Sequence, residues 1–162
     1  MAIQVIHTDQ DIFSLPAVAV INPVNLVGVM GAGLALQFKR RFPQVFYMYS
    51  DAIKDGSFKA GNIQAVYTLK DSAAYALPLP PECVINFPTK HHWKDPSDYE
   101  LISLGLQALV TLVNQVRISS IAIPPLGCGC GGLDKEKILD MIHAEFLPFV
   151  RKYLNVCYLV RF

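Results

Sequence analysis

Residues 17–42 read AVAVINPVNLVGVMGAGLALQFKRRF. Val18–Ile21 is a short apolar run typical of a buried strand, which we expect to end at Asn22-Pro23. The glycine-rich stretch Val27–Gly33 follows, and apolar residues then recur every fourth position up to the proline that ends the pattern, at Leu34, Phe38 and Phe42 before Pro43. A strand, a glycine loop and an amphipathic helix in direct succession predict an α/β unit.

The same succession returns near the C-terminus. Ile121–Ile123 predicts a buried strand entering Pro124-Pro125, and the glycine-rich loop Leu126–Gly132 follows it. Apolar residues then mark a final helix, which Pro148 should kink or shorten; they are Ile138, Met141, Ile142 and Phe149. Two such units predict that both loops lie at the carboxyl edge of one sheet, where ligands usually bind in open α/β folds.

The remaining segments extend the alternation. We predict further strands at Ile3–His7, Ile63–Leu69, Val84–Phe87 and Val156–Val160. A second helix carries Phe46, Tyr49 and Ile53 and stops near Gly56, and a third helix is capped by Asp98 with Leu101, Leu104, Gly105, Ala108 and Leu112 on one face. The pattern predicts an α/β fold with helices on both faces of a mostly parallel central sheet, as one domain over residues 1–162.

Composition fits a buried globular protein. The 162 residues are 52% hydrophobic and 17% charged, and the net charge of +1 indicates no global field for nucleic acid, so such a role needs a local patch. No apolar run approaches the roughly 20 residues of a membrane span, and the N-terminus does not resemble a signal peptide. The cysteines, which match no zinc spacing, predict reduced thiols, and we expect a cytoplasmic monomer without cofactor or metal; they are Cys83, Cys128, Cys130 and Cys157.

The two loops differ from common nucleotide motifs. The first has glycines at 28, 31 and 33, a G-x-x-G-x-G spacing and not the Rossmann G-x-G-x-x-G, and neither loop contains the G-K-[ST] of a P-loop. Two glycine loops facing one crevice can bring backbone N–H groups to a pyrophosphate. The alternative is that they are only tight turns and helix entries.

At this point the chain resembles the macrodomain family, which implies a three-layer α/β/α fold with a mixed, mostly parallel central sheet. Asp11–Asn25 is similar to the family's opening, Gly28–Ala35 to its first substrate loop, and Ile123–Gly129 to its phosphate loop. Val84–Trp93, reading VINFPTKHHW, resembles the N-F-P-T-K-x-H-W stretch of DarG-type macrodomains, which remove ADP-ribose from thymidine in single-stranded DNA. The chain departs from the family pattern with Gln10 before the opening aspartate. DarG proteins also carry a region C-terminal to the macrodomain.

The resemblance implies an ADP-ribose site. Asp11 would accept a hydrogen bond from the adenine amino group, or it caps a turn; Asn25 would meet ribose hydroxyls, or it forms an Asx-turn. The glycines at 127, 129 and 131 would present N–H groups to the phosphates. The full set of implied ligand contacts is Asp11, Ile12, Asn22, Asn25, Gly28, Val29, Met30, Gly31, Ala32, Gly33, Leu126, Gly127, Cys128, Gly129, Cys130 and Gly131.

Two residues are implied to carry chemistry. Lys90, which we expect in a loop with Pro88 after a strand end, would attack the anomeric carbon of an opened ribose and give a Schiff base; the alternative is a surface lysine or a phosphate contact. Asp134 would act as acid or base near the same carbon, or it caps the last helix. One aspartate can do both.

A basic, aromatic cluster follows Lys90. Its members are His91, His92, Trp93 and Lys94, and we predict that they contact single-stranded DNA, with a base stacked on Trp93 and a phosphate on Lys94. Trp93 is alternatively a loop anchor packed on the core. The basic run at 39–41 is interpreted as the solvated face of the first helix.

Three functions follow from the resemblance. The leading hypothesis is a metal-independent glycohydrolase that removes ADP-ribose from thymidine in single-stranded DNA, as an antitoxin with a cognate ADP-ribosyltransferase toxin as its partner. The second removes ADP-ribose from acidic side chains of proteins. The third is a reader that binds ADP-ribose without turnover and has no need of Lys90.

Overall fold

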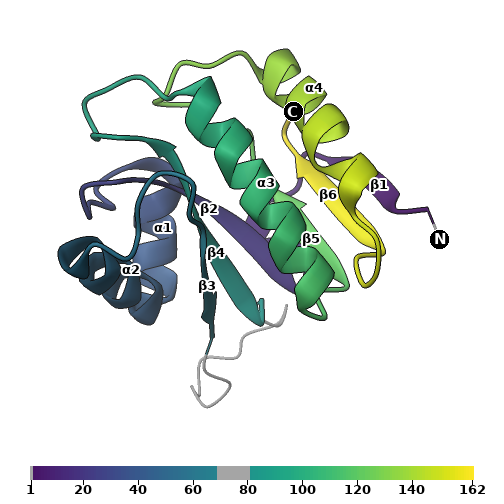
Figure 1. The fold of residues 1–162 in the computed structure, drawn as a ribbon, viewed down its shortest axis with the longest axis horizontal. Helices are drawn as coiled ribbons and strands as arrows, with labels where there is room; N and C mark the ends of the chain where they lie inside the picture. Colours follow the sequence, from purple (N-terminus) through teal and green to yellow (C-terminus); the bar gives the residue numbers. More distant parts are fainter. Residues whose placement is uncertain (1, 69–80) are drawn as a thin grey trace.

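The computed structural model describes residues 2–68 and 81–162, and its centre is a six-stranded sheet in the order β1-β6-β5-β2-β4-β3 (Figure 1). The predicted strand end at Leu69 lies outside the described residues. The strands are β1 (Gln4–Thr8), β2 (Ala19–Asn25), β3 (Gln64–Tyr67), β4 (Cys83–Lys90), β5 (Ser120–Ile123) and β6 (Val156–Val160). The helices are η1 (Ile12–Ser14), α1 (Gly33–Arg41), α2 (Pro43–Asp55), α3 (Tyr99–Gln115), α4 (Lys135–Glu145) and η2 (Leu147–Phe149).

The sheet is mixed and mostly parallel, as predicted. β1, β6, β5, β2 and β4 run parallel to their neighbours, and β3 pairs antiparallel with β4 at one edge. The carboxyl ends of β2, β4, β5 and β6 therefore meet at one edge of the sheet, which is where a ligand site is expected in an open α/β fold.

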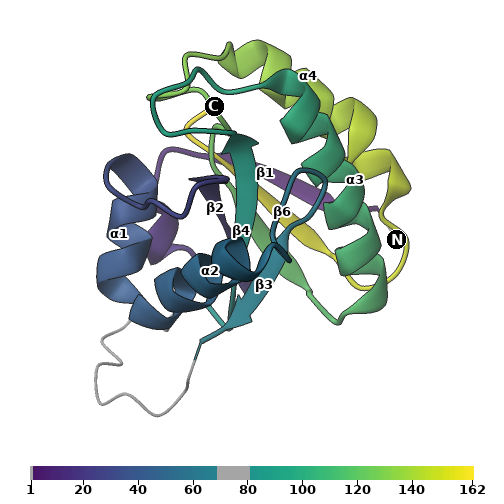
Figure 2. The same cartoon turned by 60° about the vertical axis from the view of Figure 1, so that its left-hand side comes forward.

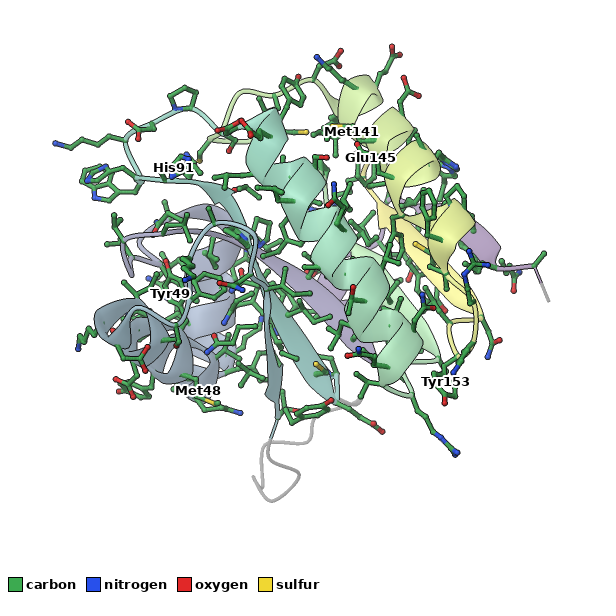
Figure 3. All side chains as sticks on the ribbon, in the orientation of Figure 1. Met48, Tyr49, His91, Met141, Glu145 and Tyr153 are labelled. Carbon is green, nitrogen blue, oxygen red and sulfur yellow. The ribbon has the colours of Figure 1, made fainter. Side chains whose placement is uncertain are left out.

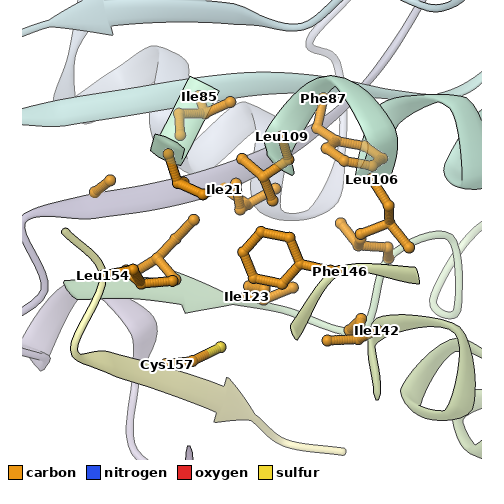
Figure 4. Packing of buried hydrophobic residues seen from close by; sticks show 14 of the residues in the cluster. Ile21, Ile85, Phe87, Leu106, Leu109, Ile123, Ile142, Phe146, Leu154 and Cys157 are labelled. Atoms are coloured by element: carbon orange, nitrogen blue, oxygen red, sulfur yellow. The ribbon is translucent and has the colours of Figure 1, made fainter. Parts of the chain in front are cut away.

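Helices cover both faces of the sheet. Figures 1 and 2 show α1 and α2 on one face and α3 and α4 on the other, which confirms the three predicted layers. Each interface has its own hydrophobic core. In the core beneath α3 and α4, Phe146 lies among Leu109, Ile123 and Ile142 (Figure 4). Among the described residues, no helix has both the length and the apolar composition that a membrane crossing requires.

The third helix begins where predicted, and its buried stripe coincides with the predicted one only at Leu101 and Gly105. Asp98 caps α3 by accepting a hydrogen bond from the N–H of Glu100. Leu104, which was expected on the buried face, is exposed. The buried face is rotated by about one position because the helix packs along a 3.6-residue period that starts at Leu101 and Ile102; it consists of Leu101, Ile102, Gly105, Leu106, Leu109 and Val113.

The last helix is shorter than its apolar pattern. α4 ends at Glu145, and Pro148 lies in the separate 3-10 turn η2, as the shortening effect of proline predicts. Phe149 was expected on the buried face of this helix, and the structure places it on the surface. Phe146 fills the core position in its place.

Candidate active site

A cavity of about 700 Å³ opens at the carboxyl edge of the sheet, and both glycine loops line it, as predicted. Residues that follow β2, β4, β5 and β6 all contribute to its wall. The lining consists of Pro23, Val24, Asn25, Val29, Gly31, Ala32, Gly33, Leu34, Ala35, Thr89, Lys90, Trp93, Ser97, Pro124, Pro125, Gly127, Cys128, Gly129, Cys130, Gly131, Lys135 and Arg161. One cavity therefore collects residues from four strand ends.

Lys90 lies in this cavity as the last residue of β4, not in a loop after the strand. Strand β4 continues through Pro88, and Val24 of β2 pairs with that proline. The next pair is Asn25 with Lys90, so Thr89 is an extra residue in the ladder. Such a bulge bends the strand and redirects the side chains after it, and the missing N–H of Pro88 gives a physical reason for the irregularity here.

Strand β2 also extends further than predicted, through Pro23 to Asn25. The strand tolerates this proline because β5 pairs only with Ala19 and Val20, so the later residues of β2 have β4 as their sole described neighbour. The extension carries Asn25 into the wall of the cavity, directly beside Lys90.

The Asn25 amide is held by its own loop and by a helix. Its Nδ2 donates to the carbonyl of Val29 at 2.8 Å, and its Oδ1 accepts from the backbone N–H of Val27 at 3.1 Å. The buried Tyr49 hydroxyl contacts the same Oδ1 at 2.6 Å and accepts from the N–H of Gly28 at 3.2 Å. Burial raises the pKa of the Tyr49 phenol above its ordinary value. Tyr49 on α2 thus fixes the first glycine loop (Figure 3).

The first loop leads into an open helix end. Gly31, Ala32 and Gly33 line the cavity, and Ala32 at the N-cap of α1 gives the helix no side-chain hydrogen bond. The first N–H groups of α1 thus receive no hydrogen bond from the side chain of the N-cap residue, which suits an anionic ligand. Met30, only 1% exposed, anchors the loop in the core and does not line the cavity, and neither does Gly28.

Asn22 lies below the cavity and does not line it. Its side chain is fully buried and donates through Nδ2 to Oδ1 of Asn86 at 2.9 Å. These two asparagines are register partners in β2 and β4. The pair therefore joins the two strands that end in Asn25 and Lys90.

The second loop provides five of the predicted contacts, residues 127–131, while Leu126 is buried in the core and does not line the cavity. Gly131 allows the backbone to approach Ser97 closely, because a β-carbon there would lie 2.0 Å from the Ser97 Oγ and 2.4 Å from the Gly127 carbonyl oxygen. Ser97 is itself 7% exposed, and its Oγ has no hydrogen-bond partner among the described residues.

The connection over residues 91–98 ties both loops together. The N–H of Leu26 donates to the carbonyl of His91 at 3.0 Å, and the N–H of Ser97 donates to the carbonyl of Gly131 at 3.0 Å. The N–H of Asp98 donates to the Thr89 carbonyl at 2.9 Å, which closes the connection onto β4. His91 lies at the end of β4 in Figure 3. This segment thus links the two loops on either side of Lys90.

Trp93 is half-exposed, at 50%, and lines the mouth of the cavity. Its ring stacks on that of His92 with centroids 5.4 Å apart, and the Lys94 Nζ lies 5.0 Å from its centroid. The exposed ring contradicts the alternative of an anchor packed on the core. His91, His92 and Lys94 do not line the cavity, and the His91 Nε2 lies 3.7 Å from an Asp98 carboxylate oxygen.

Asp11 and Asp134 both act as caps. The Asp11 Oδ1 accepts from the N–H of Phe13 at 3.0 Å, and the Asp134 Oδ1 accepts from the N–H of Glu136 at 3.1 Å. Neither aspartate lines the cavity, and Ile12 is buried beside the first of them. The capping interpretation is therefore confirmed for both aspartates. The ligand-binding role of Asp11 and the catalytic role of Asp134 stay predictions.

Two cations of the cavity wall were missed by the sequence analysis. Lys135 begins α4 and Arg161 follows β6, and the Lys135 Nζ donates to the Arg161 carbonyl at 2.9 Å. With Lys90 they make three cationic residues in the lining, and no described residue of the lining is Asp or Glu. The cavity is therefore strongly cationic in a chain of net charge +1. No motif marks either residue, because each reaches the cavity only through the fold.

The four cysteines are free. Burial raises the pKa of the Cys83 thiol and of the Cys157 thiol to about 12 each. Burial is also the main cause that raises the pKa of the Cys128 thiol, with nearby Lys135 opposing it. In the described part of the chain, His, Cys, Asp and Glu side chains form no group of three that could hold a metal ion.

Comparison with known proteins gives a consistent picture. The model of the family described as "Macro domain" matches residues 21–142. A relative from Mycobacterium tuberculosis, named DNA ADP-ribosyl glycohydrolase, is 41% identical over 136 residues, which cover 84% of this chain and 37% of the relative. The chain thus spans little more than a third of that protein.

Solved structures agree with this comparison. The macrodomain of Mycobacterium tuberculosis DarG has a TM-score of 0.83 and 38% identity, covering 97% of this chain and 98% of that one. Thermosipho africanus DarTG in complex with ADP-ribose has a TM-score of 0.83 and 30% identity, covering 98% of this chain and 42% of that one.

Proposed function

This chain belongs to the Macro domain family, and from that premise we propose that it binds ADP-ribose in the cationic cavity and hydrolyses its bond to thymidine in single-stranded DNA. The observation that supports this proposal most strongly is the position of Lys90. It lines the same cavity as the two glycine loops and is the register partner of Asn25 in the pairing of β4 with β2. The 41% identical relative that is named DNA ADP-ribosyl glycohydrolase supports the same activity.

The cavity wall suits a pyrophosphate. The uncapped start of α1 and the backbone of residues 127–131 flank one space, where N–H groups stabilise negative charge. Lys135 and Arg161, together with the absence of carboxylates from the described lining, add to this attraction. The ADP-ribose complex of the Thermosipho africanus protein supports the choice of ligand.

Lys90 would supply the chemistry. Its Nζ forms a bond to the anomeric carbon while the bond from that carbon to the base nitrogen breaks, and the base leaves with the electron pair and takes up a proton. Opening of the sugar ring converts this adduct to a Schiff base. Water then adds to the C=N bond, and the lysine departs, so that ADP-ribose is released and Lys90 is regenerated. Asp134 is the proposed acid or base for these proton transfers.

The mouth of the cavity favours a nucleobase as the leaving group. Trp93 and Val29, both exposed, line the cavity that holds Lys90. An aromatic ring at this position can stack on a base, and the ammonium of Lys94 beside it can meet a phosphate. We propose that His91 and His92 complete this DNA contact.

The deciding experiment is a hydrolysis assay on two substrates. One is an oligonucleotide with ADP-ribosylated thymidine, the other a protein ADP-ribosylated on glutamate, and each is tested with wild type, Lys90→Ala and the exposed control Lys54→Ala. We expect release from DNA that Lys90→Ala abolishes while its Kd for ADP-ribose changes less than threefold. Release from protein alone would favour the ester hydrolase, and binding without release from either would leave a reader.

The wider context is also proposed. We propose that the protein acts as a cytoplasmic monomer and as the antitoxin of a cognate ADP-ribosyltransferase, as its similarity to DarG and DarTG suggests. Co-expression with such a transferase tests this partner: wild type should rescue growth, and Lys90→Ala should not. Analytical ultracentrifugation tests the monomer.

A further inference from the structure

Ser97 is the only buried residue of the connection over residues 91–98, and it lines the cavity. Its Oγ has no hydrogen-bond partner among the described residues. In the described part of the chain, one other buried side-chain nitrogen or oxygen atom lacks a partner, the Asn22 Oδ1, and Asn22 does not line the cavity. Buried hydroxyl groups are nearly always hydrogen-bonded, so an unpaired one in a cavity wall requires an explanation.

The Ser97 hydroxyl lies against the backbone of the second glycine loop. A β-carbon at Gly127 would lie 3.1 Å from the Ser97 Oγ, and a β-carbon at Gly131 would overlap that oxygen. Gly131 does not have a left-handed φ, so the lack of space beside Ser97 and the Gly127 carbonyl accounts for the glycine there. The hydroxyl and the loop are therefore in direct contact without a hydrogen bond between them.

The backbone of Ser97 is fixed, whereas the loop that covers its side chain turns on glycines. The N–H of Ser97 donates to the Gly131 carbonyl at 3.0 Å, and the N–H of Asp98 donates to the Thr89 carbonyl at 2.9 Å. The loop has left-handed φ values at Gly127 and Gly132, which glycine adopts without strain. Small rotations of the loop peptides can therefore bring a backbone group to a hydroxyl that stays in place.

Ligand binding supplies a reason for such a rotation, and this step rests on the proposed function. The N–H groups of residues 127–131 would turn toward the pyrophosphate, which reorients the peptides that surround Ser97. A hydroxyl donates one hydrogen bond and accepts others, so it can pair with either a carbonyl or an N–H group that turns toward it. A ligand stabilises the loop arrangement to which it binds more tightly.

We propose that Ser97 is a positioning residue for the second glycine loop, whose hydroxyl is unpaired in the conformation described here and forms a hydrogen bond to the loop backbone when ADP-ribose binds. A buried hydroxyl without a partner destabilises the fold, and its pairing on binding removes that cost. The Ser97 hydroxyl therefore contributes to affinity and opposes the stability of the protein without ligand. A hydroxyl with a purely structural role would instead contribute to stability alone.

The test is calorimetric titration of ADP-ribose into wild type and Ser97→Ala, with Tm measured for each protein without ligand. We expect Ser97→Ala to bind roughly threefold to tenfold more weakly, because one hydrogen bond of the bound state is lost. Its Tm should equal or exceed that of wild type, because the substitution removes a buried polar atom that has no partner.

Ser120→Ala is the matched control with the opposite expectation. Ser120 is buried at the start of β5, and its Oγ accepts from the N–H of Val18 at 2.9 Å. Its removal leaves that N–H unpaired, so the Tm should fall while the Kd for ADP-ribose stays unchanged. The two serine variants should thus differ in the sign of their effect on Tm and in whether they affect binding.

Hydrogen exchange of the amides over residues 127–132, measured at saturating ADP-ribose, reports on the loop itself. Protection should be lower in Ser97→Ala than in wild type, and equal protection would overturn the positioning role. A Kd for Ser97→Ala within about twofold of wild type, or a Tm clearly below it, would also overturn this inference and leave the proposed function intact. Absence of ADP-ribose binding by wild type would overturn both.

Discussion

Asn25 and Lys90 are cross-strand partners in β2 and β4, one step beyond the bulge at Thr89. The bulge and the pairing together determine where the lysine enters the cavity. Asn25 in turn is held by the Tyr49 hydroxyl, which comes from α2. The buried Tyr49 phenol thus holds the Asn25 amide, and the backbone of Asn25 lies beside that of the proposed nucleophile Lys90.

Replacing Tyr49 with Phe tests this chain. The variant keeps the buried ring and removes the hydroxyl that accepts from the Gly28 N–H and contacts the Asn25 Oδ1. Leaving buried partners without a hydrogen bond costs about 1–3 kcal/mol in the free energy of unfolding. Urea denaturation should show this loss, and hydrolysis should slow because the first loop and Asn25 are less well fixed.

Tyr47→Phe is the matched control, since Tyr47 is 64% exposed on the same helix. It should leave the free energy of unfolding within about 0.5 kcal/mol of wild type and leave hydrolysis unchanged. Equal behaviour of the two variants would mean that the Tyr49 hydroxyl is not needed to hold the loop.

Gly131→Ala should disrupt the second loop. The added β-carbon would lie 2.0 Å from the Ser97 Oγ and 2.4 Å from the Gly127 carbonyl oxygen, and the second of these is backbone that cannot rotate away. Overpacking of this kind costs about 1–3 kcal/mol, and the displaced loop should bind ADP-ribose more weakly. Thermal denaturation and calorimetric titration measure the two effects.

Gly129→Ala separates the steric effect from a general effect of losing a glycine. No atom lies within 4 Å of a β-carbon at position 129, and its φ is not in the left-handed region. Its Tm should therefore stay near that of wild type. A Tm for Gly131→Ala that matched the Tm of Gly129→Ala would contradict the close approach to Ser97.

Local patterns predicted the architecture well because short stretches of sequence determine strands, glycine loops and helix caps. The periodic apolar residues, the Asp98 cap and the two loops gave the layers and the edge at which the cavity lies. Local patterns failed where contacts between neighbouring strands determine where a strand ends. Pro23 and Pro88 were interpreted as strand ends, yet β2 and β4 continue past them because the neighbouring strands tolerate the missing N–H groups.

The cavity wall was predicted only in part, for the same reason. Glycines and Lys90 stand in recognisable runs, whereas Ser97, Lys135 and Arg161 reach the wall from three separate segments. Arg161 needs a positive φ and a hydrogen bond from Lys135, which is 26 positions away. No spacing rule encodes such a contact.

Asp134 offers a separation of capping from catalysis. Asn is as good an N-cap as Asp, so Asp134→Asn should keep the α4 cap and its stability, while Asp134→Ala should lose about 1 kcal/mol. If Asp134 transfers protons, hydrolysis falls strongly in both variants, because an amide cannot serve as acid or base. A hydrolysis rate near that of wild type in Asp134→Asn would mean that Asp134 only caps α4 and takes no part in proton transfer. Asp98→Asn, at the cap of α3, is the control for the exchange itself.

Trp93→Ala tests whether the mouth of the cavity recognises DNA. The ring is exposed beside His92 and Lys94 and lines the same cavity as Lys90. Base stacking on an aromatic side chain contributes about 1–3 kcal/mol per base, so KM for the modified oligonucleotide should rise by about tenfold or more. The Kd for free ADP-ribose, which has no base beyond the reacting ribose, should change less than threefold.

The comparison with Phe149→Ala makes that result specific. Phe149 is 49% exposed and lies in η2, outside the cavity wall, so its removal takes away a similar exposed aromatic surface without touching the site. This control should hydrolyse the oligonucleotide as wild type does. A rise in KM for Trp93→Ala alone would place the DNA strand across the ring, because only a ligand that extends past the reacting ribose can sense the loss. Equal loss of oligonucleotide and ADP-ribose binding would instead make Trp93 a wall of the ADP-ribose site, and the choice between DNA and protein would then have to come from other residues of the rim.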